Sequence, residues 1–181
     1  IAMRLPDALK SDREVLSELE TNVIFKLLDS VIEDIKSYRL EEGAGLEKDL
    51  LLRIDLIESH LEAIKKIDPE RNDKIEMKLR DSLENLKIDV DANRFEQELI
   101  FYLEKFDITE EKVRLKNHLD YYRKIMKSDV PIGKKLGFIT QEIGREINTI
   151  GSKANHAELQ KIVVQMKDEL EKIKEQLLNI L

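Results

Sequence analysis

Apolar residues recur at intervals of three and four along most of the chain, which is the pattern of amphipathic helices. The pattern begins near Asp12, a suitable N-cap, and its first stripe reaches Val31. Gly43 and Gly45 interrupt it, either as a break between two helices or as a local distortion of one long helix. The members of the first stripe are Leu16, Leu19, Val23, Leu27 and Val31.

A second apolar stripe runs over 46–64 and is predicted to end at Asp68, just before Pro69. Proline fits the first turn of a helix much better than its interior. Pro69 therefore predicts the start of a third helix over 69–86. After the polar stretch Asp89 to Asp91, a fourth helix is predicted over 92–104.

The second half of the chain predicts two further helices before the last one. Asp107 or Thr109 is expected to cap a helix over 109–128, because two glutamates follow in its first turn, where the helix dipole favours them. Another helix is predicted over 134–149. The segment Gly151-Ser152-Lys153 then predicts a turn at 151–153.

The final helix, from about Asn155 to the end, carries a strict seven-residue repeat. A repeat of this kind predicts a left-handed seam between packed helices. The partner helix lies either within the chain or in a second subunit. The apolar positions, spaced 4-3-4-3-4-3, are Leu159, Val163, Met166, Leu170, Ile173, Leu177 and Ile180.

Together these patterns predict an all-α protein, with an elongated helical region over 1–108 followed by a C-terminal helical domain over 109–181. Composition agrees: 38% of residues are charged and only 5% are aromatic. Such a mixture favours surface-charged helices over sheets. The absence of cysteine excludes disulfides, thiolate metal sites and a cysteine nucleophile.

Charge is distributed unevenly, although the net charge of the chain is −7. Residues 1–108 hold 27 acidic and 17 basic side chains, whereas 112–153 hold 10 basic and 4 acidic ones. A local cluster of cations is what phosphate binding requires, so the basic tract 112–153 is compatible with RNA. It is also compatible with an ordinary solvated helix face, which charge alone favours. No apolar run approaches the ~20 residues that span a bilayer, so we expect a soluble, cytoplasmic protein.

Polar side chains with possible catalytic roles lie at the edge of the predicted helix 109–128. At 100° per residue, Glu111 and His118 flank its apolar stripe and Arg114 lies further out on the same edge. His118 is either a boundary residue hydrogen-bonded to a carboxylate, or a general acid/base or metal ligand. The other histidines, His60 and His156, are expected to be structural or exposed. The stripe consists of Leu115, Leu119, Tyr122 and Met126.

The predicted helix 134–149 carries Glu142 and Glu146 one turn apart on one flank. Two such carboxylates can bind Mg²⁺ or Mn²⁺ through oxygen, although glutamates at this spacing are common on ordinary helices. An antiparallel pairing with the preceding helix would bring them beside His118 and Glu111. We therefore predict a catalytic group of His118, Glu111, Glu142 and Glu146, with Glu142, Glu146 and His118 as metal ligands.

Cations and hydrogen-bond donors surround these acids, as a phosphate would require. The predicted turn before the last helix also offers backbone N–H groups. Tyr121, Tyr122 and Phe138 either stack on bases or pack in the core. The predicted RNA contacts are Arg114, Lys134, Lys135, Arg145, Asn148, Ser152 and Lys153.

One long segment resembles a known family. GKKLGFITQEIGREINTIGSKANHAELQKIVVQMKDELEKIKEQ, residues 133–176, closely resembles the C-terminal signature of the YicC/YloC endoribonucleases, with its Asn-Thr-Ile-Gly-Ser-Lys core. Upstream, DITEEKVRLKNHL at 107–119 matches the family's preceding element. A weaker match, RLEEGAGLEKD at 39–49, resembles its central helical segment.

The resemblance implies metal-assisted cleavage of structured or small regulatory RNA by a ring-like homo-oligomer, a hexamer in the full-length family. It also implies that the family's N-terminal domain is missing from this chain. Two other interpretations stay open: a non-catalytic oligomerisation or RNA-binding module whose catalysis needs that domain, and a plain coiled-coil scaffold.

Overall fold

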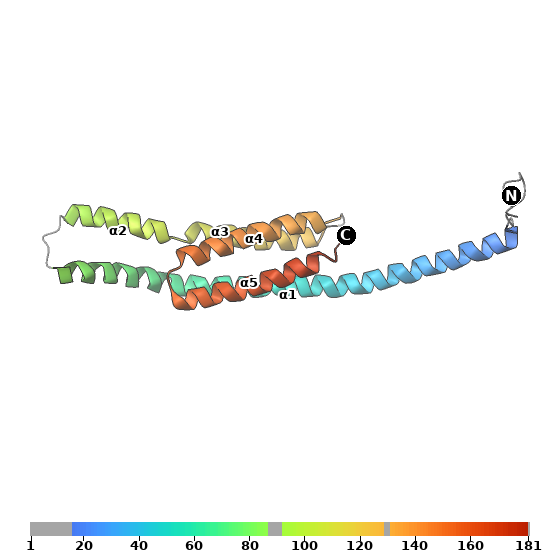
Figure 1. The fold of residues 1–181 in the computed structure, drawn as a ribbon, viewed down its shortest axis with the longest axis horizontal. Helices are drawn as coiled ribbons and strands as arrows, with labels where there is room; N and C mark the ends of the chain where they lie inside the picture. Colours follow the sequence, from blue (N-terminus) through green and yellow to red (C-terminus); the bar gives the residue numbers. More distant parts are fainter. Residues whose placement is uncertain (1–15, 87–91, 129–130, 181) are drawn as a thin grey trace, which may run out of the picture. The chain divides into compact units, whose positions relative to one another are not determined.

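The computed structural model describes residues 16–86, 92–128 and 131–180. These residues form five helices and no strand, which confirms the predicted all-α fold (Figure 1). Contacts between Cα atoms divide the chain into two compact units, Ile1–Gly45 (unit 1) and Leu46–Leu181 (unit 2). The predicted cap at Asp12 and the polar stretch at 89–91 lie outside the described residues. The helices are α1 (Glu18–Leu86), α2 (Ala92–Phe106), α3 (Thr109–Met126), α4 (Gly133–Lys153) and α5 (Ala157–Leu177).

Helix α1 is uninterrupted where the sequence predicts helix ends. It continues through Gly43 and Gly45, so these glycines lie inside one long helix. It also continues through Pro69, and the predicted boundary there is wrong. An interior proline costs ~3 kcal/mol. Beside it, the buried Arg71 is paired with Asp68 and donates to the Phe106 carbonyl, and these bonds hold the helix in place around Pro69.

The hydrophobic core of unit 2 joins the middle of α1 to α3, α4 and α5 (Figure 1). α3 packs along α4, and α4 packs along α5. The predicted domain boundary at residue 108 stays a prediction. Residues on both sides of that position contribute to this core. On α1 the buried members are Leu50, Ile54, Ile57, Leu61 and Ile64; the later helices add Leu115, Leu119, Tyr122, Leu136, Ile139, Ile143 and Ile147 among others.

The apolar seam formed by the seven-residue repeat of α5 packs against helices of the same chain. Its first five positions are buried in the core of unit 2, and Leu177 and Ile180 pack against that core. The open choice between an internal seam and an intersubunit seam is therefore settled in favour of the internal one. The five buried positions are Leu159, Val163, Met166, Leu170 and Ile173.

Helices α4 and α5 approach each other closely at two glycines. A Cβ atom on Gly151 would lie 3.0 Å from Val163 Cγ1, and one on Gly144 would lie 3.1 Å from Leu170 Cδ2. The predicted turn at 151–153 is wrong, because α4 extends to Lys153. Gly151 is a helical residue whose lack of a side chain allows the contact with α5, and the connection follows at 154–156.

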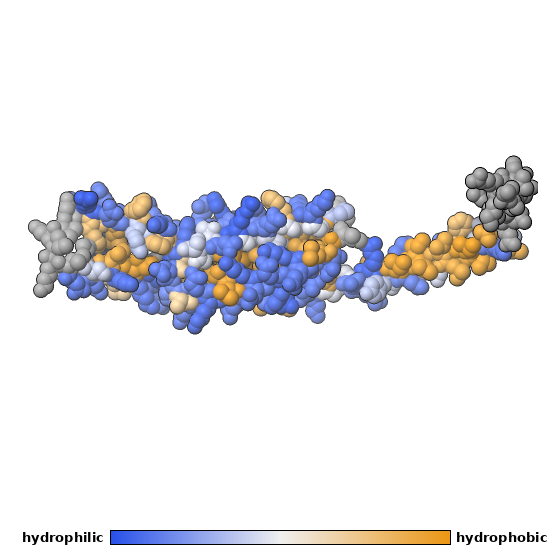
Figure 2. All heavy atoms as spheres, viewed as in Figure 1, coloured by the Kyte–Doolittle hydropathy of each residue, from blue (hydrophilic) through white to orange (hydrophobic). Residues whose placement is uncertain are grey.

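Unit 1 carries an exposed apolar face. Apolar side chains from 16 to 35 are about half or more exposed, with Leu19 at 79%. Figure 2 shows these hydrophobic atoms gathered over unit 1. Among the described residues, no helix combines the length and the apolar character needed to cross a membrane. The face consists of Leu16, Leu19, Val23, Ile24, Leu27, Leu28, Val31, Ile32 and Ile35.

Candidate functional site

The packing of α3 against α4 brings the two predicted polar edges together around Glu146. This carboxylate is buried, and burial raises its pKa above the ordinary glutamate value. The charges of Arg114 and His118 on α3 act in the opposite direction, whereas Glu111 and Glu142 raise the pKa further. All four neighbours are therefore close enough to act electrostatically on Glu146. We call these five residues the α3–α4 cluster.

Glu111 forms the inner end of the α3–α4 cluster. Its side chain is buried, and its Oε1 accepts a hydrogen bond of 2.7 Å from Lys153 Nζ. The same ammonium donates to the Asp107 carbonyl at 2.9 Å. Lys153, a predicted phosphate contact, is thus already bonded within the protein. Oε2 of Glu111 is buried with no hydrogen-bond partner among the described residues.

The outer side of the cluster is open to solvent. Arg145 is exposed and donates from Nη1 to Glu142 Oε1 at 2.6 Å. Arg114 is also exposed and is hydrogen-bonded to Glu110. His118 is partly buried. A phosphate that approached from solvent would therefore meet two guanidinium groups before it reached the buried carboxylates.

The cluster does not form a ready-made metal site. Over the part of the chain that the structure describes, no three histidine, aspartate or glutamate side chains are grouped to hold a metal ion. Glu142 is paired with Arg145, and Glu111 with Lys153. The ligand set predicted from sequence, Glu142, Glu146 and His118, stays a prediction.

Acidic residues of α1 neutralise much of the basic tract 112–153. Lys112 Nζ lies 2.6 Å from Asp68 Oδ2, and Lys116 Nζ lies 3.0 Å from Glu58 Oε1. The Arg123 guanidinium is paired with both Asp55 and Glu58. The basic tract therefore presents fewer uncompensated cations at the surface than its sequence suggests.

The remaining predicted phosphate contacts lie on the outside of α4. Lys134, Lys135 and Asn148 are exposed. Lys135 Nζ is 5.3 Å from the centroid of the Tyr121 ring, a cation–π contact that leaves both groups at the surface. The Ser152 hydroxyl donates to the Thr149 carbonyl at 2.9 Å.

The three aromatic candidates have separate positions. Tyr122 is buried in the core, and its hydroxyl has no partner among the described residues. Burial raises the pKa of Tyr122 above its usual range. Tyr121 and Phe138 are exposed. Stacking on a base is therefore open to Tyr121 and Phe138 and closed to Tyr122.

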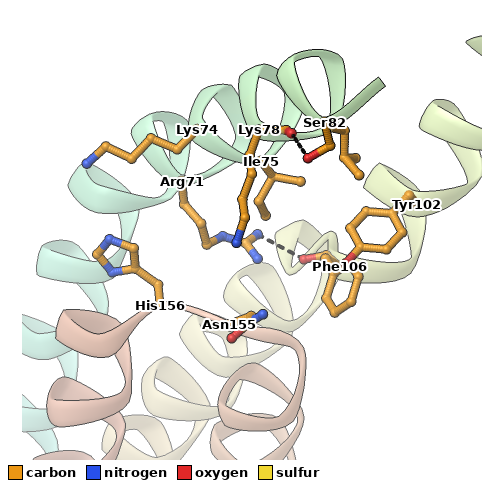
Figure 3. Close-up of a pocket in the computed structure, with 10 residues that line it drawn as sticks. Arg71, Lys74, Ile75, Lys78, Ser82, Tyr102, Phe106, Asn155 and His156 are labelled. Carbon is orange, nitrogen blue, oxygen red and sulfur yellow. Dashed lines mark hydrogen bonds between the residues drawn. The ribbon is translucent and has the colours of Figure 1, made fainter. Parts of the chain in front are cut away.

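A second polar site was not predicted from the sequence. A cavity of about 270 Å³ lies between α1, α2 and the connection that leads into α5 (Figure 3). Its cations, Arg71, Lys74 and Lys78, belong to the acidic half of the chain, so the charge count hid them. The one available signal was the spacing of Lys74 and Lys78, which places both on one helix face. The remaining lining residues are Ile75, Leu79, Ser82, Tyr102, Phe106, Asn155 and His156.

Comparison with known proteins bears on both sites. Residues 64–181 match the family described as "Endoribonuclease YicC-like, C-terminal". The chain is 35% identical over 185 residues to "Probable endoribonuclease YicC" of Clostridioides difficile strain 630. It is 27% identical over 178 residues to the protein of the same name from Haemophilus influenzae. Each alignment covers 98% of this chain and 62% of the relative, so the chain spans less than two thirds of their length.

Proposed function

Because the chain belongs to the YicC-like endoribonuclease family, we propose that it takes part in the internal cleavage of RNA at the α3–α4 cluster. One observation carries the proposal: Glu146 is a buried carboxylate with a raised pKa, acted on by the charges of His118 and Arg114. A proton acceptor, a second proton carrier and a fixed cation are the groups that phosphodiester cleavage uses.

In the proposed reaction, the ribose 2′-hydroxyl attacks the adjacent phosphorus and the bond from phosphorus to O5′ breaks. Ionised Glu146 accepts the proton of the 2′-hydroxyl, and protonated His118 donates a proton to the departing O5′. Arg114 stabilises the negative charge that develops on the phosphate oxygens. The products are one strand with a 2′,3′-cyclic phosphate and one with a 5′-hydroxyl.

The raised pKa of Glu146 suits the role of base. A base works best when its pKa lies near the working pH, and an ordinary glutamate is too acidic. Burial moves Glu146 in the required direction. Glu111 and Glu142 support this role because their negative charges also favour the protonated form of Glu146. Both are positioning residues in this proposal.

We propose that RNA approaches along the exposed side of α4. Lys134, Lys135 and Asn148 are exposed there, close in sequence to Arg145. Their contacts would be with phosphate and sugar, which position a strand without reading its sequence. Binding should therefore weaken steeply with salt. Because the proposed substrate is RNA, we also propose that the protein is cytoplasmic.

We further propose that the chain acts within a homo-oligomer. The heptad positions of α5 are not the contact surface, because they are buried within unit 2 or packed against its core. The apolar face of unit 1 is the described surface suited to the role, since patches of this kind commonly mark interfaces. Leu27→Asp with Val31→Asp should lower the mass measured by light scattering and leave unit 2 folded. An unchanged mass would place the contact elsewhere.

A divalent cation is a separate proposal that the cleavage assay can test. Mn²⁺ or Mg²⁺ at Glu142, Glu146 and His118 would make both glutamates essential. The proton-transfer mechanism makes Glu146 essential and Glu142 only supportive. Cleavage by Glu142→Gln and Glu146→Gln across a Mn²⁺ titration separates these two mechanisms.

The decisive experiment measures cleavage of a labelled structured RNA by this chain, alone and joined to the N-terminal part of the Clostridioides difficile relative. Glu146→Gln and His118→Ala should each slow cleavage by about 10²–10⁴-fold with little change in RNA affinity. Glu171→Gln, at an exposed glutamate of α5, is the matched control. A substrate with a 2′-deoxyribose at the cut site should resist cleavage.

Three outcomes are informative. Cleavage only by the joined form supports the module interpretation, in which this chain binds RNA and depends on the N-terminal part. Binding without cleavage by either form removes the nuclease proposal. Full activity of Glu146→Gln and His118→Ala in a properly folded protein would show that the α3–α4 cluster is only a polar rim between two packed helices.

A further inference from the structure

The cavity between α1, α2 and the start of α5 has the size of a site for one small polar group. Its volume of about 270 Å³ is just below the ~300–1,000 Å³ of typical small-molecule sites. It is lined by Lys74 and Lys78 on one wall and by Tyr102 and Phe106 on another (Figure 3). None of its described lining residues is acidic. The cavity therefore favours an anion that also carries an apolar or aromatic part.

The cations of α1 are available to a ligand to different degrees. Lys74 Nζ lies 3.6 Å from Glu70 Oε2, at an exposed position. Lys78 has no ion pair within the described part of the chain, and its backbone carbonyl accepts a hydrogen bond from Ser82. Lys74 and Lys78 lie one helical turn apart on the same face of α1. The Lys78 side chain points into the cavity, whereas the Lys74 side chain extends away from it (Figure 3), so a change of the Lys74 rotamer would bring both ammonium groups to one phosphate.

A fixed positive charge lies beneath these two lysines. Arg71 is buried and bonded to Asp68, and Lys112 is paired with the same carboxylate. Arg71 thus places a guanidinium at the base of the cavity, with its charge partly compensated by Asp68, while Lys112 also lies within electrostatic reach of Asp107. Because Arg71 also donates to the Phe106 carbonyl, its guanidinium cannot swing out toward solvent and acts as a rigid charge.

The opposite side of the cavity offers a ring surface and an unpaired polar atom. Tyr102 and Phe106 lie one turn apart on α2, with ring centroids 4.7 Å apart. Tyr102 is 38% exposed, which leaves part of the residue open to a stacked base. His156 borders the cavity, and its Nδ1 is buried with no partner among the described residues. A ligand hydroxyl or phosphate would supply that partner.

We propose that this cavity binds one phosphate-bearing nucleotide, with its phosphate on Lys74 and Lys78 and its base against Tyr102. The nucleotide is either one unit of an RNA strand or a free mononucleotide. The RNA source rests on the proposed function. The RNA source is favoured because Lys153 connects the cavity to the α3–α4 cluster. The Lys153 carbonyl accepts a hydrogen bond from Arg71 of the cavity, and the Lys153 ammonium donates one to Glu111 of the cluster.

The test measures binding of two probes by fluorescence anisotropy and calorimetry: a labelled 2′-O-methyl RNA decamer, which this chemistry cannot cut, and uridine monophosphate. The variants are Lys74→Gln with Lys78→Gln, and Tyr102→Leu. The control is Lys167→Gln, an exposed lysine of α5 roughly 16 Å further along that helix than His156.

We expect the double lysine variant to weaken binding at least tenfold and to lower the salt slope of the decamer by roughly 0.7–1.4. Tyr102→Leu should cost roughly fivefold or more. Binding of both probes assigns a nucleotide site open to free mononucleotides, and binding of the decamer alone assigns an RNA subsite. The inference is overturned if neither variant differs from Lys167→Gln with either probe.

The same assay separates this inference from the proposed nuclease. Glu146→Gln should slow cleavage of ordinary RNA by about 10²–10⁴-fold and leave binding of the decamer unchanged. If no form of the protein cuts RNA but uridine monophosphate still binds through Lys74 and Lys78, the nuclease proposal fails and the nucleotide site stands. Circular dichroism of each variant checks that the helices remain folded, as expected for the exposed positions 74, 78 and 102 and for the isosteric change at buried Glu146.

Discussion

Replacement of Arg71 by methionine tests how unit 2 is held together beside Pro69. The Arg71 side chain is 1% exposed, although it carries a full charge. Its Nε donates to Asp68 Oδ1 at 2.9 Å, its Nη2 to the Phe106 carbonyl at 2.9 Å, and its Nη1 to the Lys153 carbonyl at 3.4 Å. One side chain thus joins α1 to the ends of α2 and α4.

The size of the effect follows from these contacts. A hydrogen bond to a charged group contributes about 1.5–3 kcal/mol, and two of the three bonds have good geometry. Lys112 would still neutralise Asp68 in the variant, and methionine would refill most of the volume. Two lost bonds would cost about 3–6 kcal/mol, and both of these effects reduce the loss, so we expect Arg71→Met to lower the free energy of unfolding by about 3 kcal/mol.

Urea unfolding followed by circular dichroism provides the measurement. Arg80→Met is the matched control, because Arg80 also bonds two carboxylates, Glu76 at 3.0 Å and Glu96 at 3.1 Å, but is 44% exposed. Its loss should cost only about 0.2–1 kcal/mol. Arg71→Lys keeps the charge but lacks the planar guanidinium group, so its loss of unfolding free energy should lie between those of Arg71→Met and Arg80→Met. The reasoning is refuted if Arg71→Met costs no more than Arg80→Met.

Three other predictions concern unit 2. The pKa of Glu146 is raised by burial, so Glu146→Gln should gain stability relative to the parent as pH rises from 4 to 7 in urea titrations. Burial alone would also raise the pKa of Glu58, but hydrogen bonds from its cationic neighbours lower it, so Glu58→Gln should lose stability over the same range. The same trend in both variants would contradict one of these two signs. Tyr122→Phe removes a buried hydroxyl without a described partner, so its melting temperature should stay the same or rise, and a fall would reveal an unseen partner. Leu170→Asp places a charge in the core, so the helical signal should collapse, whereas dissociation into folded monomers would contradict an internal seam.

The polar edges of α3 and α4 were predictable because they depend on helical period alone. Once Leu115, Leu119 and Tyr122 mark the buried stripe of α3, the places of Glu111 and His118 follow at 100° per residue. The short connection between α3 and α4 makes the two helices neighbours. The sequence could not show the hydrogen bond between Glu111 and Lys153, which depends on where α4 ends.

The wrong helix boundaries share one physical cause. Local signals at Pro69 and Gly151 indicate interruptions, and tertiary contacts override both. Beside Pro69, Arg71 donates to the carbonyls of Phe106 and Lys153. The approach of Val163 gives Gly151 a packing role inside α4. These contacts are not visible in a local pattern, because each partner belongs to another helix.

The basic tract shows why a charge count along a sequence is a poor guide to a surface. The cations of α3 face α1, where Asp55, Glu58 and Asp68 neutralise Lys112, Lys116 and Arg123. The cations of the nucleotide cavity were missed for the converse reason. Lys74 and Lys78 lie in the half of the chain, 1–108, whose total charge is negative, although the described cavity lining contains no acidic residue.

These two redistributions of charge favour a bipartite interaction with RNA over a single basic groove. The α3–α4 cluster combines proton carriers with one exposed guanidinium group, that of Arg114, and a second one, that of Arg145, lies beside it. Both guanidinium groups are already bonded to glutamates. Such a site is poorly equipped to hold a strand by charge alone. The cavity at Lys74 and Lys78 has the opposite character, with cations, a ring surface and no described proton carrier except His156. Anchoring at one site and cleavage at the other would let each be changed separately, and the variants proposed for each site measure that independence.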